Sequence, residues 1–179
     1  MKPIYWPIDD RAFVRTFTPD DAEELFALVE VNRERLEAWM PWAESTRSVA
    51  DQLRFIERGL ASEHDQEANG IWVADRVVGA IGLSVDPLVN AGELGYWIDA
   101  GHEGRGLVTE ASRRFLDHAF GVLKLHRVAL RAGVENRRSR AVAERLGFRE
   151  EGVIRDGDRV GGGRYVDMVL YGLLEDEWR

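Results

Sequence analysis

The chain has no cysteine, so it can form neither disulfide bonds nor thiolate metal sites. Apolar residues make up 45% of it, but they occur in short runs that never approach the ~20 consecutive apolar residues a membrane-spanning helix needs. The N-terminal ten residues also lack the apolar core of a secretory signal peptide. We therefore expect a cytoplasmic protein that does not act at a membrane.

Metal and nucleic-acid sites are also poorly supported by the composition. Direct binding to nucleic acid requires a basic footprint, yet 24 Lys and Arg face 32 Asp and Glu, for a net charge of −8. We expect no nucleic-acid contact. We also expect no metal, because the histidines show no ligand spacing; they are His64, His102, His118 and His126.

The charge is distributed unevenly along the chain. Residues 101–149 contain 11 basic and 5 acidic residues, whereas residues 1–67 contain 8 basic and 15 acidic ones. Chance and solvated helix faces explain this uneven charge, and a functional explanation is equally good. The functional interpretation is an anionic ligand at the basic segment and a cationic partner at the acidic one.

A length of 179 residues without internal repeats predicts a single domain spanning 1–179, with a core at about 12–173. Periodicity predicts helices that begin near Thr18 and at 48–60, 107–123 and 138–146. Alternating or continuous apolar runs predict strands at 12–17, 71–74, 77–85, 93–98, 127–131, 148–155 and 165–173. This order is typical of an α/β (α+β) fold, in which helices flank a mixed sheet.

A glycine-rich turn between the strand at 93–98 and the helix at 107–123 is the most informative segment. Gly104 and Gly106 let the backbone adopt left-handed angles and approach a ligand closely. Free N–H groups and the positive end of the helix dipole meet there, which favours phosphate. A tight turn without a ligand is an equally good interpretation. The segment is no P-loop, and Thr109 stands where a dinucleotide fingerprint has its third glycine.

Several motifs in order along the chain carry a family resemblance. They are Trp-Met-Pro-Trp at 39–42, Glu-Leu-Gly-Tyr-Trp-Ile at 93–98, Gly-Arg-Gly at 104–106, Asn-x-x-Ser at 136–139, Leu-Gly-Phe-x-x-Glu-Gly at 146–152 and Tyr-x-Asp-x-x-x-Tyr at 165–171. With them the chain resembles a GCN5-related N-acetyltransferase (GNAT), of the ribosomal-protein serine/alanine N-acetyltransferase subgroup. The resemblance implies the GNAT fold: a mixed, mostly antiparallel sheet of about six to seven strands with about four helices.

The resemblance also implies acetyl-CoA as the donor. The pantetheine arm would lie along the backbone of Trp97, Ile98 and Asp99. The pyrophosphate would bind the amides of the following turn, which comprises His102, Glu103, Gly104, Arg105, Gly106 and Leu107. The charged phosphates would be met by arginines, for which a solvated helix face is the alternative; these are Arg105, Arg137, Arg138 and Arg140.

Two residues of the turn depart from the family pattern. Glu103 replaces a neutral or basic residue, and Val108 replaces a small one. Backbone amides do most of the binding, so we expect the cofactor still to bind. An acidic side chain beside a pyrophosphate weakens that binding.

The resemblance suggests which groups handle protons. Many relatives protonate the departing thiolate with a tyrosine, but Ala143 stands at that position. We expect Ser139 to substitute for it, with Asn136 orienting the cofactor or a water; a helix cap is the alternative role for the serine. For the base that deprotonates the amine, Asp158 in an expected glycine-rich loop at 156–163 is slightly favoured over Glu93.

The acceptor pocket is expected between the first two helices, the aromatic element and the glycine loop. Trp39, Trp42 and Tyr165 are its candidate contacts, although tryptophans more often belong to a core. The favoured acceptor is a protein N-terminal α-amine, acetylated directly without a covalent acetyl-enzyme. A small amine (polyamine, amino acid or aminoglycoside) and a non-catalytic acyl-CoA-binding domain are the alternatives. The chain is expected to be a monomer or homodimer.

Overall fold

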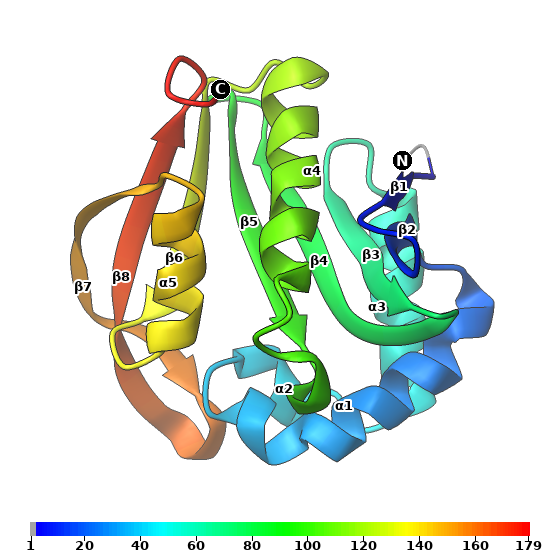
Figure 1. The fold of residues 1–179 in the computed structure, drawn as a ribbon. Helices are drawn as coiled ribbons and strands as arrows, with labels where there is room; N and C mark the ends of the chain where they lie inside the picture. The colour runs from blue at the N-terminus through cyan, green and yellow to red at the C-terminus, as the bar shows by residue number, and fades with distance from the viewer. Residues whose placement is uncertain (1–2) are drawn as a thin grey trace.

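One mixed β-sheet runs through the molecule, and helices pack on both of its faces (Figure 1). The computed structural model describes residues 3–179, and of Gln66 the backbone alone. In this part of the chain, eight strands form one sheet in the order β1-β2-β3-β4-β5-β6-β8-β7. The strands are β1 (Tyr5–Pro7), β2 (Ala12–Thr16), β3 (Gln66–Val73), β4 (Arg76–Asp86), β5 (Ala91–Ile98), β6 (Arg127–Gly133), β7 (Arg149–Val160) and β8 (Arg164–Leu174).

The two faces of the sheet carry different helices and separate apolar cores. On one face lie α4 (Leu107–Gly121) and α5 (Arg137–Arg145); on the other lie α1 (Ala22–Glu37) and α3 (Val49–Ala61), with the short α2 (Pro41–Ser45) at the lower edge (Figure 1). Consecutive strand residues point to opposite faces. Ile71 therefore packs in the core beneath α4, while Trp72 packs against α1 and α3.

The expected fold is confirmed, with three local differences. The sheet has an additional edge strand, β1, which is only three residues long and too short to show periodicity. The aromatic segment contains the helix α2, which begins at Pro41. The expected loop at 156–163 is mostly strand: β7 continues to Val160 after a register shift between Ile154 and Asp158, and only Gly161–Gly163 form the turn.

The pairing of β5 with β6 is the feature that opens the site. It is the one parallel pairing among the described strands, and it lasts for three residue pairs, from Ala91 opposite Arg127 to Glu93 opposite Ala129. Beyond that point β5 stays with β4, and β6 stays with β8. The two strands diverge (Figure 1), and the edge of β5 beyond Glu93 faces no neighbouring strand.

The start of α1 yields a prediction for stability. Asp21 accepts hydrogen bonds from Arg15 (2.7 and 2.8 Å) and from the Thr18 backbone N–H (2.7 Å). Burial raises the pKa of Asp21, but these bonds outweigh it and leave the pKa below its ordinary value of 3.8. The carboxylate therefore stabilises the fold above that value, and its contribution is lost as the pH falls through the lowered pKa.

We expect Asp21→Asn to lower the free energy of unfolding at neutral pH by about 1–3 kcal/mol, because it weakens the bonds to Arg15. The difference from the unsubstituted protein should shrink in acid. Urea unfolding at several pH values measures both effects. A constant difference down to the lowest pH would contradict this explanation.

Candidate active site

The turn before α4 has the backbone geometry of an anion site. Gly104 and Gly106 have φ values of +72° and +79°, which residues with a Cβ rarely adopt, and space is open where each Cβ would lie. The first N–H groups of a helix have no partner within it, and the N–H groups of residues 104–107 donate to no other described residue. These free donors and the α4 dipole fit a pyrophosphate.

The segment just before the glycines is fixed by its own hydrogen bonds. The Asp99 carboxylate accepts from Asn32 Nδ2 (2.8 Å), from the Gly101 N–H (3.0 Å) and, in one tautomer, from His102 Nδ1 (3.0 Å apart). Burial raises the pKa of Asp99. The hydrogen bonds from His102, Asn32 and Gly101 lower it by a larger amount, so the net shift is downward. The charged carboxylate therefore holds the 3-10 turn Ala100–His102 in place.

Part of the backbone assigned to the cofactor is already used by the protein. The His102 and Glu103 N–H groups donate within the 3-10 turn, to the Asp99 and Ala100 carbonyls. The Asp99 N–H donates to the Val78 carbonyl (2.7 Å), and the Ile98 carbonyl accepts from Arg35. The donors that remain open on the turn are therefore those of residues 104–107.

Glu103 lies between two arginines from distant parts of the chain. It forms ion pairs with Arg35 of α1 and Arg138 of α5. The Glu103 side chain is 20% exposed, whereas that of Arg138 is 80% exposed. The acid that departs from the family pattern is therefore neutralised in place, and it engages the arginine predicted to meet a phosphate.

The other departure and the remaining arginines are also placed by the fold. Val108 is 9% exposed and belongs to the core beneath α4, where a larger side chain fits. Arg140 hydrogen-bonds to the Tyr171 hydroxyl (3.0 Å) and pairs with Glu150 (3.2 Å). Arg105 and Arg137 are exposed. Their exposure is compatible both with a phosphate contact and with a solvated helix face.

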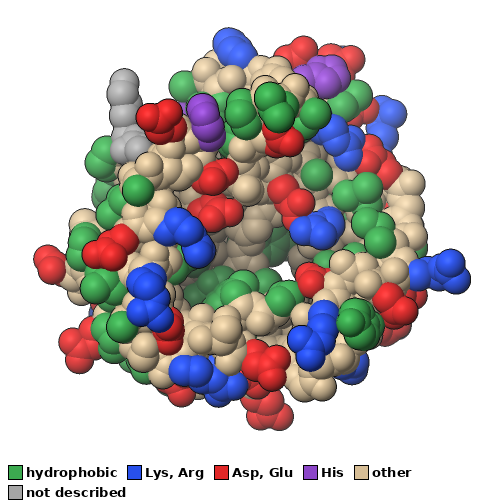
Figure 2. Space-filling model, turned by 180° about the vertical axis from the view of Figure 1, so that it is seen from behind, with side chains coloured by type: hydrophobic (Ala, Val, Ile, Leu, Met, Phe, Trp, Pro, Cys, Tyr) green, Lys and Arg blue, Asp and Glu red, His purple; other side chains and the backbone are tan. Residues whose placement is uncertain are grey.

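A cavity of about 1040 Å3 opens beside β5, on the face that carries α2 and α3. Figure 2 shows the hollow on the rear of the molecule, with acidic and basic side chains around it. Its floor is formed by residues paired directly across β4 and β5, which therefore share one face. The pairs are Ala80 with Trp97, Gly82 with Gly95 and Ser84 with Glu93.

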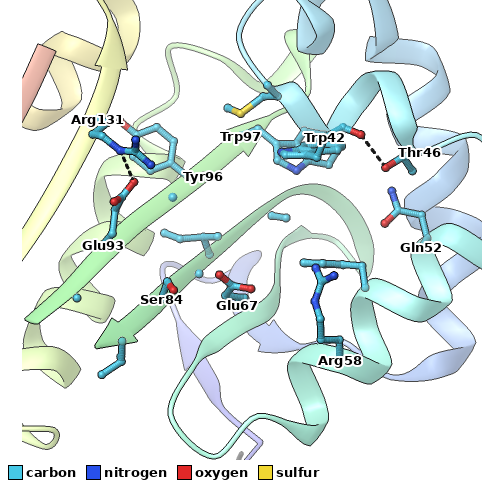
Figure 3. Close-up of a pocket in the computed structure, with 18 of the residues that line it drawn as sticks. Trp42, Thr46, Gln52, Arg58, Glu67, Ser84, Glu93, Tyr96, Trp97 and Arg131 are labelled. Atoms are coloured by element: carbon cyan, nitrogen blue, oxygen red, sulfur yellow. Dashed lines mark hydrogen bonds and ion pairs between the residues drawn. The ribbon is translucent and has the colours of Figure 1, made fainter. Parts of the chain in front are cut away.

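The cavity walls combine aromatic and charged groups (Figure 3). Trp42 of α2 lies against Trp97, with ring centroids 6.1 Å apart. Glu93 accepts a hydrogen bond from Arg131 of β6 (2.8 Å). Glu67 of β3 also lines the cavity, and it forms no ion pair with another described residue. The site thus offers an apolar wall and carboxylates to an incoming cation.

Part of this floor is empty because Gly95 has no side chain, although the backbone conformation at this position does not require a glycine. Its φ lies outside the left-handed region, and nothing lies within 4 Å of the position its Cβ would take. Its partner Gly82 is different, because a Cβ there would lie 2.5 Å from Glu67 Cα. The fold thus requires a glycine at 82 but tolerates a side chain at 95, which would project into the cavity.

Ser139 faces a phenol across the gap between β5 and β6. Its Oγ lies 3.0 Å from the Tyr96 hydroxyl. Asn136 caps α5 instead, since its side-chain oxygen accepts from the Ser139 N–H (3.2 Å). Burial raises the pKa of Tyr96 to about 12, so the phenol keeps its proton at physiological pH. Because Asn136 caps the helix, the serine hydroxyl is not used as a helix cap.

Three of the residues predicted for the acceptor pocket or as the base lie outside the cavity wall. Trp39 packs on β6, where a Cβ at Gly133 would meet its ring at 2.7 Å. Tyr165 is 60% exposed at the start of β8. Asp158 is half-buried in β7, on the same face as the buried Val160, and its carboxylate accepts from the Arg159 N–H (2.8 Å). Among the predicted residues, the wall contains Trp42, Trp97 and Glu93.

The sequence analysis missed several groups that shape the site. Asn32 and Arg35 reach the turn from α1, 63 to 68 residues away in sequence, so no local spacing could reveal them. Tyr96 stood inside a quoted motif, but only the fold brings it to Ser139. Glu67 lies within a register shift of β3, between Gln66 and Asn69, where strand periodicity is interrupted.

Metal-binding clusters and membrane-spanning helices are both absent from the described residues. Within residues 3–179, no group of three or more His, Asp or Glu side chains could hold a metal ion. No helix in that range is both long and apolar enough to cross a membrane.

Comparison with known proteins identifies relatives over almost the whole length. Residues 11–149 match the family described as "Acetyltransferase (GNAT) domain". "Putative ribosomal N-acetyltransferase YdaF" of Bacillus subtilis (strain 168) is 39% identical over 176 residues, covering 96% of this chain and 95% of the relative.

Solved structures agree with the fold. The structure of a "Probable acetyltransferase" has a TM-score of 0.89 and 36% identity, covering 98% of this chain and 99% of the other. The "Microcin C7 self immunity acetyltransferase MccE in complex with Acetyl-CoA and AMP" has a TM-score of 0.84 and 25% identity, covering 93% and 94%.

We expect Glu103→Gln to tighten acetyl-CoA binding about fivefold, since a surface charge of this kind contributes up to ~1 kcal/mol. The variant removes a negative charge from the turn and releases Arg138. Isothermal titration calorimetry at low and physiological salt measures the change in affinity. Glu34→Gln, an exposed residue of α1 without an ion pair among the described residues, is the matched control. Unchanged or weaker binding would contradict the prediction.

Proposed function

Because the chain belongs to the GNAT acetyltransferase family, we propose that it acetylates the N-terminal α-amine of a protein. The protein is an acetyl-CoA-dependent N-acetyltransferase. The identity of the amine acceptor is the part we propose.

The size of the cavity carries this proposal. At about 1040 Å3 it lies just above the ~300–1,000 Å3 range of pockets that enclose drug-sized ligands. A simple amine fills only part of such a space, whereas the first residues of a polypeptide fill more of it. The empty position at Gly95 extends the free path along the floor towards the open edge of β5.

Charge and relationship support the same acceptor. A free α-amine is mostly protonated at neutral pH, and Glu67 offers it a carboxylate in the cavity that no described arginine or lysine pairs with. A relative that is 39% identical over nearly its full length bears the name of a ribosomal N-acetyltransferase. The carboxylate fits any cationic amine, and the name of the relative favours a peptide end over the small amines.

The transfer itself needs two proton movements. Acetyl-CoA supplies a thioester whose carbonyl carbon the neutral amine attacks, so that a C–N bond forms and the C–S bond breaks. We assign Ser139 to give its hydroxyl proton to the departing sulfur, while its Oγ takes up a proton from solvent so that no alkoxide is left. A carboxylate takes the proton that the amine loses. The chain contains no cysteine to form an acetyl-thioester intermediate, which favours direct transfer.

Asp158 and Glu93 are the candidates for the accepting carboxylate, and they differ in their partners. Glu93 lies in the cavity wall and is paired with Arg131. Asp158 lies on β7, a strand that contacts α2, and it forms no ion pair among the described residues. Glu93 is therefore held in place by a cation, whereas the Asp158 carboxylate has only the Arg159 N–H on it among the described residues.

The first test measures CoA release with an acceptor panel. We expect turnover of peptides with a free Ser or Ala N-terminus and none of the same peptides with a blocked N-terminus. Turnover only of spermidine, amino acids or an aminoglycoside would overturn the protein acceptor. Gly95→Leu should reduce kcat/KM for the peptide at least ~100-fold while leaving the Kd of acetyl-CoA within about twofold, because it fills the cavity. Gly121→Leu, which also has open space at its Cβ, is the matched control on α4.

The second test identifies the base. Replacing the true base, in Asp158→Asn or Glu93→Gln, should lower kcat/KM at neutral pH by about 10²-fold or more. The remaining activity should rise with pH, because solvent then deprotonates the amine. The exposed Glu57→Gln on α3 serves as the control. Two variants with pH profiles like that of the unsubstituted enzyme would rule out both carboxylates.

A further inference from the structure

Tyr96 reaches from β5 to helix α5, where its hydroxyl is within hydrogen-bond distance of two atoms of Ser139. Its hydroxyl lies 3.0 Å from Ser139 Oγ and 3.3 Å from the Ser139 carbonyl oxygen. Tyr96 also lines the cavity (Figure 3), so its contact with Ser139 connects the cavity to helix α5. The contact between Tyr96 and Ser139 joins strand β5 to helix α5.

The chemistry of the two hydroxyls restricts how they share protons. With its pKa raised to about 12 by burial, the phenol retains its hydrogen at physiological pH. The nearby Ser139 carbonyl can only accept, and Ser139 Oγ can accept or donate. A serine within a helix often donates back to a carbonyl one turn earlier, but Ser139 Oγ has no such bond among the described residues. Either hydroxyl of the pair can be the donor, and when the phenol donates to Oγ, the serine hydrogen is left without an acceptor among these residues.

We propose that Tyr96 is a positioning residue: its phenol donates to Ser139 Oγ and thereby directs the serine hydrogen towards the departing sulfur. The proposal rests on the role assigned to Ser139 in the proposed function. It also accounts for Ala143, since a phenol from β5 takes part where the family's tyrosine on α5 is absent. In the reaction the serine proton goes to sulfur, a proton from solvent replaces it on Oγ, and the phenol bond holds Oγ in position throughout.

A purely structural role would be to tether α5 to the sheet, and the chain contains a matched example. The Tyr171 hydroxyl of β8 accepts from Arg140 Nε at 3.0 Å, and Arg140 follows Ser139 on the same helix. Both tyrosines link the sheet to the first half of α5, but only Tyr96 contacts Ser139. Tyr171→Phe therefore removes a tether without affecting the proposed proton donor.

The experiment compares Tyr96→Phe, Tyr171→Phe, Ser139→Ala and the double variant Tyr96→Phe/Ser139→Ala. CoA release is followed with whichever acceptor is turned over, or with water where no amine is. We expect Tyr96→Phe to lower kcat about 10- to 100-fold, within the range of general acid catalysis, with KM for acetyl-CoA within about twofold. The double variant should be no slower than Ser139→Ala, because Tyr96 acts through the serine. Tyr171→Phe should keep its kcat.

The results separate this proposal from the proposed function. If Ser139→Ala keeps full activity, the role of Ser139 fails and the Tyr96 proposal fails with it. If Ser139→Ala is impaired but Tyr96→Phe is not, only the Tyr96 proposal is overturned. Additive losses in the double variant, or equal losses in Tyr96→Phe and Tyr171→Phe, also overturn it. Thermal unfolding of each variant completes the set: a Tyr96→Phe loss that recovers at a lower assay temperature identifies a stability effect and overturns the proposal.

Discussion

The short pairing between β5 and β6 is the constraint on which the rest of the site depends. Three residue pairs hold the two strands together, and then each follows a different neighbour. Unpaired backbone groups are costly when buried, so an open strand edge inside a fold needs water or a ligand. We propose that the pantetheine arm of acetyl-CoA, which carries amide groups, meets this need. On this proposal the same split provides the cofactor site and the path between the cavity and helix α5.

Such a split has to be prevented from closing, and side chains on both sides do this. Asn32 and Arg35 attach the end of β5 to α1, through Asp99 and the Ile98 carbonyl. On the β6 side, the Trp39 ring occupies the space over Gly133. Trp39 thus contributes as packing on the diverging strand, which explains how an aromatic residue near the site can serve it without lining the cavity.

The sequence predicted what depends on local pattern. The strand, glycine turn and helix at 93–121 follow from periodicity and from the need for left-handed glycines, and the structure has them there. The contacts that neutralise Glu103 depend on residues 35 and 138, which only the fold brings together. The extent of β7 was underestimated for a related reason, since a register shift interrupts the alternation on which strand prediction relies.

The two main departures from the family pattern are therefore best understood together with their partners. Glu103 alone suggests weaker cofactor binding, but beside Arg35 and Arg138 it is one member of a charge network that connects α1, the turn and α5. Ala143 alone suggests a missing proton donor, but Tyr96 brings a phenol to Ser139 from the opposite strand. In each case the residue that contacts the site of the departure comes from far away in the sequence. An unusual residue in a motif is thus weak evidence for lost function until its spatial neighbours are known.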